Sequence, residues 1–122
     1  MKLFLILGAI NGFLAVALGA FGAHGLEDKL SEKALGTWDK AVTYQMFHTM
    51  ALLVTGLLLA KFQSGGMIWA GWLFFAGIVL FSGSLYTYST TGIKVFALIT
   101  PLGGVAFLAG WILLGYSVSK YL

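Results

Sequence analysis

The chain has 122 residues, of which 60% are hydrophobic and 9% charged, and its mean hydropathy is +0.96. Soluble domains usually carry about 25% charged residues, so this composition predicts a single integral membrane domain with the lipid bilayer as its partner. The net charge of +3 comes from isolated lysines, which form no basic face, so we expect no nucleic acid partner. The absence of cysteine excludes disulfides, thiolate metal sites and a cysteine nucleophile.

Four apolar stretches are long enough to cross a hydrocarbon core of ~30 Å, which takes about 20 helical residues. They cover residues 3–23, 41–60, 67–88 and 94–118. Their apolar residues are continuous rather than alternating, and an open sheet would leave backbone groups unpaired in lipid. The sequence therefore predicts an all-α integral membrane four-helix bundle that forms one domain over residues 1–122.

The first stretch also has features of a secretory signal, because Lys2 precedes the apolar run and small residues follow at its end. The run is longer than the ~7 to 15 residues of a signal core. We therefore expect this segment to be retained as the first span.

The connection 24–40 contains all four acidic residues and three of the seven lysines. Leu26, Leu30 and Ala34 recur every four residues, which predicts a short amphipathic helix that lies along the membrane surface between spans 1 and 2. Gly36 is expected to end this helix, and Thr37 to cap the second spanning helix.

The other connections, 61–66 and 89–92, predict tight turns. Pro101 interrupts the fourth span, so that helix either kinks there or begins there with Thr100 as its cap. Three lysines fall on the side of the termini and four on the other side, which nearly balances the positive-inside rule. We expect both termini inside, with insertion in both orientations as the alternative.

Small residues fall on one face of the first helix, at steps of four, three, four and three. They are Gly8, Gly12, Ala15, Gly19 and Gly22. Such a face lets two helix backbones approach closely in lipid. Two interpretations stay open: the face packs inside the chain's own bundle, which we favour, or it forms the interface of a homo-oligomer.

Polar residues concentrate in the second span. We expect Gln45, His48 and Thr49 to face the bundle interior, because an unpaired amide or imidazole in hydrocarbon forfeits several kcal/mol. We also expect His48 to stay neutral and to reach a polar group of another helix. The candidates for that group are Asn11, Ser84 and Thr100.

An up-and-down topology would bring several polar residues towards one membrane face. The candidate ligand-binding pocket comprises His24, Gln45, His48, Ser82, Ser84, Tyr86 and Thr100. The leading functional hypothesis is a membrane protein that binds or passes a small ligand, ion or lipid through this pocket. The alternative is a structural or accessory subunit whose polar residues only hold helices together.

The chain lacks the residues that several kinds of transport, catalysis and metal binding need. No Asp or Glu lies inside the four spans, which disfavours a proton-coupled exporter built on an intramembrane carboxylate. There is no phosphate-binding glycine loop, serine–base pair or carboxylate pair. His24, His48 and Glu27 lack a recognised metal spacing. The sequence therefore predicts no enzyme, no cofactor and no metal site.

Four separated motifs occur in order along the chain: GAFGAHGL at 19–26, YQMFH at 44–48, LFSGSLY at 80–86, and TPLGG at 100–104 with Gly110–Trp111 after it. On these motifs the chain resembles domain-of-unknown-function family 423, over essentially its whole length. The resemblance implies a multi-pass protein of the bacterial cytoplasmic (inner) membrane. It transfers no established activity or substrate.

Overall fold

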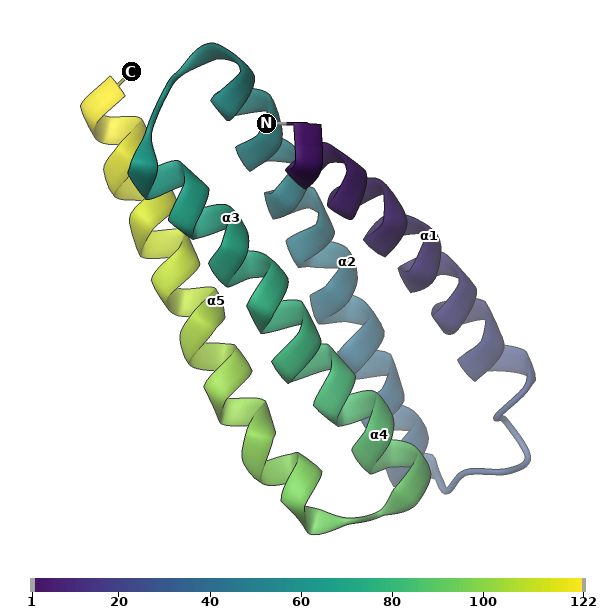
Figure 1. The fold of residues 1–122 in the computed structure, drawn as a ribbon. Coiled ribbons are helices and arrows are strands. Elements are labelled where there is room, and N and C mark those ends of the chain that lie inside the picture. Colours follow the sequence, from purple (N-terminus) through teal and green to yellow (C-terminus); the bar gives the residue numbers. More distant parts are fainter. Residues whose placement is uncertain (1, 122) are drawn as a thin grey trace.

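The computed structural model describes residues 2–121, and this part of the chain is helical with no strand. The elements are α1 (Lys2–His24), α2 (Glu32–Lys61), α3 (Gly65–Gly77), the π-helix η1 (Ile78–Ser82), α4 (Gly83–Thr91) and α5 (Lys94–Tyr121). Because α3, η1 and α4 follow one another without a break, they form one long helix (Figure 1). The four resulting helices are each long and apolar enough to cross a membrane, which confirms the predicted fold class.

Successive long helices run in opposite directions, so the two ends of the chain lie at the same end of the bundle (Figure 1). The main packing pairs are α1 with α2 and α3 with α5, and α2 joins them by packing on α3, η1 and α4. The core lies between these helices, where Phe4, Leu52, Met67 and Phe74 are fully buried. The helices α2 and α3–α4 thus form the centre, and α1 and α5 flank it.

The connection between α1 and α2 differs from the prediction. Residues 25–31 form turns, in which the Leu26 carbonyl accepts the N–H groups of Lys29 and Leu30 at 3.0 and 3.1 Å. A separate interfacial helix is therefore not confirmed. The helix α2 begins at Glu32, where the Ser31 hydroxyl caps it by accepting the Ala34 N–H at 3.1 Å.

The predicted break at Gly36 and cap at Thr37 are wrong, because both residues lie inside α2. One glycine inside a helix costs about 1 kcal/mol, which the packing of a long amphipathic helix outweighs. The Thr37 hydroxyl donates instead to the Lys33 carbonyl at 3.2 Å.

The fourth long helix begins at Lys94, so the alternative in which it starts at Pro101 is wrong. Pro101 lies inside α5, where it has no N–H to donate to the carbonyl of Ala97. The hydroxyl of Thr100 donates to the Phe96 carbonyl at 3.3 Å, beside the missing backbone bond.

The small-residue face of α1 packs against α2. Along it, Gly8 faces Leu53, Gly12 faces Thr49, Gly19 faces Val42 and Gly22 faces Trp38, and Ala15 is buried between them. A Cβ atom at Gly8 would lie 2.6 Å from the Leu53 side chain, so Leu53 packs directly on the backbone of α1 at this glycine. This face is used within the chain, and a homo-oligomer would have to use another surface.

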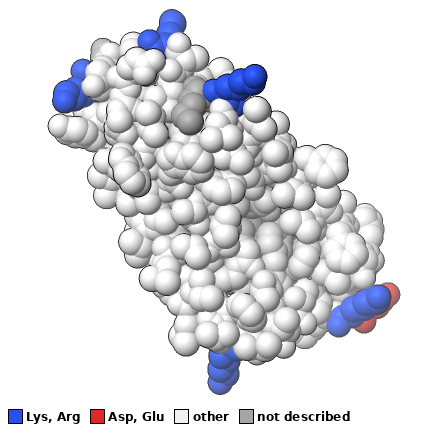
Figure 2. All heavy atoms as spheres, in the orientation of Figure 1, with Lys and Arg blue, Asp and Glu red and all other residues white. Residues whose placement is uncertain are grey.

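On the face drawn in Figure 2, charged side chains lie only at the two ends of the bundle, and the belt between them is uncharged and exposes many large apolar side chains. Lys2, Lys61 and Lys120 lie at the end that carries the termini, and all four acids lie between residues 27 and 39, at the other end. The apolar belt matches the hydrocarbon core, and the charged ends match the two aqueous sides.

Candidate functional site

The amide of Gln45 connects three helices. Its Nε2–H donates to Asn11 Oδ1 at 3.0 Å, and the Tyr86 hydroxyl donates to its Oε1 at 2.7 Å. Asn11 Nδ2–H in turn donates to the Leu7 carbonyl at 2.9 Å. This chain of hydrogen bonds runs from α1 through α2 to α4. It pairs the polar side chains of Asn11, Gln45 and Tyr86 at the contact of these three helices.

His48 points to the other half of the bundle. Its Nδ1 lies 2.8 Å from the Tyr44 carbonyl oxygen, and Trp111 Nε1–H donates to its Nε2 at 3.0 Å. A carbonyl only accepts and an indole N–H only donates, so the geometry requires a proton on Nδ1 and none on Nε2. His48 is therefore held as the neutral Nδ1–H tautomer, with both nitrogens occupied.

Aromatic rings surround His48. The imidazole stacks on Phe107 with ring centroids 3.5 Å apart and planes 9° from parallel. The ring of Phe81 lies 5.5 Å from Phe107 and 4.5 Å from Tyr44, and Phe47 lies 5.6 Å from Trp111. We call these six residues, Tyr44, Phe47, His48, Phe81, Phe107 and Trp111, the aromatic cluster.

The aromatic cluster lines a groove between α2 and α5 with a volume of about 460 Å³, which we call the α2–α5 groove. Pro101, Gly104, Val105 and Leu108 of α5 complete its walls. Phe47 and Leu108 are 58% and 66% exposed at membrane depth, so the groove opens towards lipid. A Cβ atom at Gly104 would meet nothing closer than 3.9 Å, so this position leaves part of the groove empty.

The hydroxyl residues of the predicted pocket join other pairs of helices. Ser82 donates to the Ala41 carbonyl at 2.8 Å and so connects η1 with α2. The hydroxyls of Ser84 and Thr100 lie 2.6 Å apart and connect α4 with α5. Within residues 2–121, no fully enclosed side-chain nitrogen or oxygen lacks a hydrogen-bond partner.

His24 lies exposed at the end of α1 and, within residues 2–121, makes no hydrogen bond or ring contact with the other candidate residues. In the described part of the chain, no three His, Asp or Glu side chains are close enough to share a metal ion. The single pocket expected from the topology is therefore divided. Gln45 and Tyr86 belong to the hydrogen-bond chain that reaches α1, whereas His48 bonds Trp111 of α5. His24 belongs to neither group.

The interior direction of Gln45, His48 and Thr49 is confirmed, since each is at most 4% exposed. The expected partner of His48 was wrong, because Asn11 pairs with Gln45, and His48 pairs with Trp111. The sequence did carry a signal for this. Trp111 lies inside the fourth span rather than at the interface where membrane tryptophans gather, and an indole N–H at hydrocarbon depth needs an acceptor.

Comparison with known proteins agrees with this architecture. Residues 18–104 match the family described as "Protein of unknown function (DUF423)". The UPF0382 membrane protein of Staphylococcus epidermidis (strain ATCC 12228) is 54% identical over 121 residues, which cover 99% of this chain and 98% of the relative. The UPF0382 membrane protein YwdK of Bacillus subtilis (strain 168) is 55% identical over 123 residues and is covered completely.

A third relative, the UPF0382 membrane protein SH2409 of Staphylococcus haemolyticus, is 50% identical over 121 residues. No solved structure matches. Neither the family description nor these names indicate an enzyme. With the family matched over most of the chain and the relatives over nearly all of it, the chain belongs to the DUF423 family and is a membrane protein.

Proposed function

We propose that this protein binds a small apolar or amphipathic molecule that enters the α2–α5 groove from the bilayer. The observation that carries the proposal is the groove itself, a hollow of about 460 Å³ at membrane depth with the aromatic cluster along it. Ligand sites are typically concave and lined by aromatic side chains. The relatives from Staphylococcus and Bacillus support a location in the bacterial cytoplasmic membrane.

The chemistry of the groove favours contact through rings and carbon chains. Both nitrogens of His48 are already bonded, so this side chain offers a ligand its ring rather than a hydrogen bond. The rings of Phe81 and Phe107 present further flat apolar surface. Passage of an ion has less support, because the polar side chains inside the bundle are paired with one another.

A photoreactive fatty acid that carries a diazirine group tests the proposal in the full chain, reconstituted in lipid nanodiscs. Illumination should label residues 44–48 and 104–111, and an excess of the unlabelled fatty acid should compete. Gly104→Leu should lower this labelling several-fold, because the new side chain fills the groove. Gly115→Leu is the matched control on the same helix, where a Cβ atom meets nothing within 4 Å.

Labelling that is spread over all lipid-facing helix surfaces, without competition, would contradict ligand binding. The second candidate function, a structural or accessory subunit, would then be favoured. It has its own supporting observation, because the hydrogen bonds of Gln45 and of Ser84 with Thr100 all connect neighbouring helices. In that case Asn11→Ala should lower bundle stability and change no ligand response.

A further inference from the structure

A second hollow lies at the end of the bundle that carries the termini, where α3 begins and α5 ends. Its volume is about 140 Å³. It is lined by Ser64, Gly65 and Gly66 from one side and by Ser117, Lys120 and Tyr121 from the other. We call it the terminal hollow. It is separate from the α2–α5 groove and shares no residue with it.

The first turn of α3 presents hydrogen-bond donors to the terminal hollow. The Ser64 hydroxyl accepts the Met67 N–H at 3.2 Å, which leaves the hydroxyl's own hydrogen unused. The N–H groups of Gly65 and Gly66 have no acceptor within residues 2–121, as is usual for the first residues of a helix. The positive end of the helix dipole points the same way.

Ser117 supplies an independent sign of a ligand. Its side chain is only 2% exposed, and its hydroxyl has no hydrogen-bond partner in the described chain. The hydroxyl is directed at Gly66, where an added Cβ atom would collide with it. Ser119, two residues further on, satisfies its hydroxyl by donating to the Tyr116 carbonyl at 2.7 Å. The Ser117 side chain is thus almost fully buried, and its hydroxyl, which is not fully enclosed, borders the terminal hollow without an acceptor among residues 2–121.

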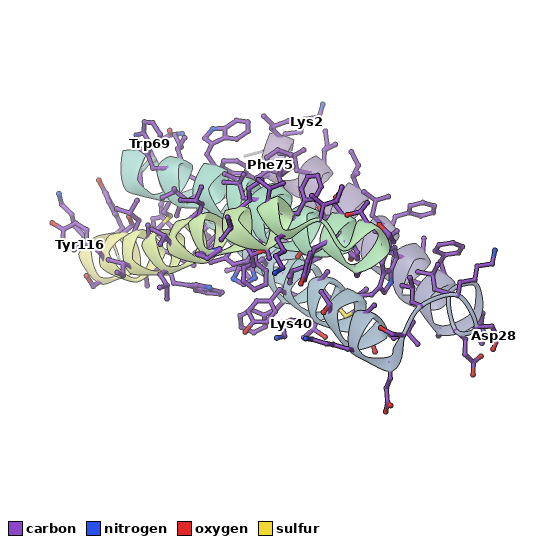
Figure 3. The ribbon with its side chains drawn as sticks, turned by 90° about the horizontal axis from the view of Figure 1, so that it is seen from below. Lys2, Asp28, Lys40, Trp69, Phe75 and Tyr116 are labelled. Carbon is purple, nitrogen blue, oxygen red and sulfur yellow. The ribbon has the colours of Figure 1, made fainter. Side chains whose placement is uncertain are left out.

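The charge at this end suits an anion. Lys120 lines the terminal hollow, whereas Lys2 and Lys61 lie at the same end of the bundle but not among its lining residues. The acids lie at the opposite end, as the positions of Asp28 and Tyr116 show (Figure 3). Among residues 2–121, the groups that converge on the hollow are therefore hydroxyls, backbone N–H groups and an ammonium, with no carboxylate side chain.

We propose that the terminal hollow binds a phosphate group, carried either by a phospholipid headgroup or by a soluble phosphate. Backbone N–H groups at a helix start together with a lysine are a known chemistry for phosphate. The position fits a headgroup, because the hollow lies where the spanning helices end and the exposed Tyr116 and Tyr121 beside it are typical of the membrane interface.

Native mass spectrometry of the purified full chain in neutral detergent tests the lipid source. The probe is phosphatidylglycerol, and diacylglycerol without a phosphate is the lipid control. Ser117→Ala and Lys120→Gln should each weaken retention of phosphatidylglycerol by about tenfold, since the first removes a hydroxyl donor and the second removes the positive charge beside the phosphate. The matched controls Ser119→Ala and Lys61→Gln should retain it as the unchanged chain does.

Inorganic phosphate tests the soluble source. At equal ionic strength, phosphate should raise the melting temperature more than chloride does, and Ser117→Ala and Lys120→Gln should abolish the difference. A response to either probe that depends on these two residues supports the site and identifies its source. No such dependence with either probe, or an equal loss in the two control variants, would overturn the proposal. Lys120 is exposed, so Lys120→Gln decides the outcome if Ser117→Ala fails to fold.

Discussion

At the scale of single residues, the imidazole of His48 is fixed by three contacts. Its Nδ1–H donates to the Tyr44 carbonyl, its Nε2 accepts the Trp111 indole N–H, and Phe107 stacks on one face of the ring. Protonation of Nε2 would remove the acceptor that Trp111 needs, so this arrangement exists only with a neutral imidazole. The side chain therefore links α2 directly to α5.

Trp111→Phe should destabilise the bundle by about 1 to 2 kcal/mol, because it removes the donor and leaves His48 Nε2 unpaired inside the protein. Unfolding by a denaturing detergent, followed by circular dichroism, measures the change. Trp69→Phe is the control, since Trp69 is 67% exposed, makes no hydrogen bond in the described chain and points outward (Figure 3). Equal effects of the two substitutions would show that the hydrogen bond to His48 contributes nothing.

Tyr86→Phe should cost about 0.6 to 1.7 kcal/mol, the range measured for hydrogen bonds between membrane helices. The substitution removes the hydroxyl that donates to Gln45 Oε1 and leaves the ring in place. Tyr88→Phe, two residues away on the same helix, removes a hydroxyl that has no hydrogen bond in the described chain. The same unfolding assay should separate the two, and an unchanged midpoint for Tyr86→Phe would refute the role of this bond.

The interior position of Gln45 and His48 was predictable because the cost of an unpaired polar group in hydrocarbon leaves few alternatives. Their partners were not, because several helices offered polar groups and the packing geometry chooses among them. Trp111 was missed for a related reason: a tryptophan counts as apolar in a span, and its one donor is easily overlooked. Ser117 was missed because its unpaired hydroxyl follows only from its position beside Gly66.

At the scale of elements, the π-helix η1 packs closely against the backbone of α5. An added Cβ atom at Gly103 would meet the backbone nitrogen of Phe81, and its Cα at 2.7 Å. Inside the same π-helix, Ser82 donates to the backbone of α2. The segment therefore contacts α5 on one side and α2 on the other, and it brings Phe81 into the aromatic cluster.

Gly103→Ala should destabilise the protein by about 1 to 3 kcal/mol, because the obstacle is backbone rather than the end of a flexible side chain. Gly115→Ala is the control, as it lies on the same helix in open space and gains helix propensity. Melting temperatures in detergent compare the two variants. A Gly103→Ala protein as stable as the Gly115→Ala protein would contradict the close contact between α5 and Phe81.

The number and limits of the long helices were largely predictable, since lengths of apolar sequence are set by the bilayer. The start of α2 was not, because Gly36 and Thr37 form a plausible boundary and only the Ser31 cap and the extra packed turns favour an earlier start. The π-helix left no signal in the sequence, because it depends on packing against α2 and α5 rather than on local propensity.

At the scale of the whole molecule, the topology predicts which connections share an aqueous side. In the absence of native cysteine, single cysteines at Ser31 and Thr91 should react with an impermeant thiol reagent from one side of the membrane. Cysteines at Lys2, Gln63 and Lys120 should react from the other side. Labelling of Ser31→Cys and Gln63→Cys from the same side would refute the four-span topology, and labelling of every position from both sides would indicate insertion in two orientations.

The way the helices pair has a consequence for assembly. The helices α1 and α2 pack on each other, α3 packs on α5, and the only covalent link between the two pairs is the short segment 62–64. Each pair is a hairpin of consecutive helices that can enter the bilayer as a unit. Residues 1–62 and 63–122, expressed together as separate chains, should therefore assemble into a complex that co-purifies. Ser82→Ala, which removes a hydrogen bond between the pairs, should weaken that complex more than Ser119→Ala does.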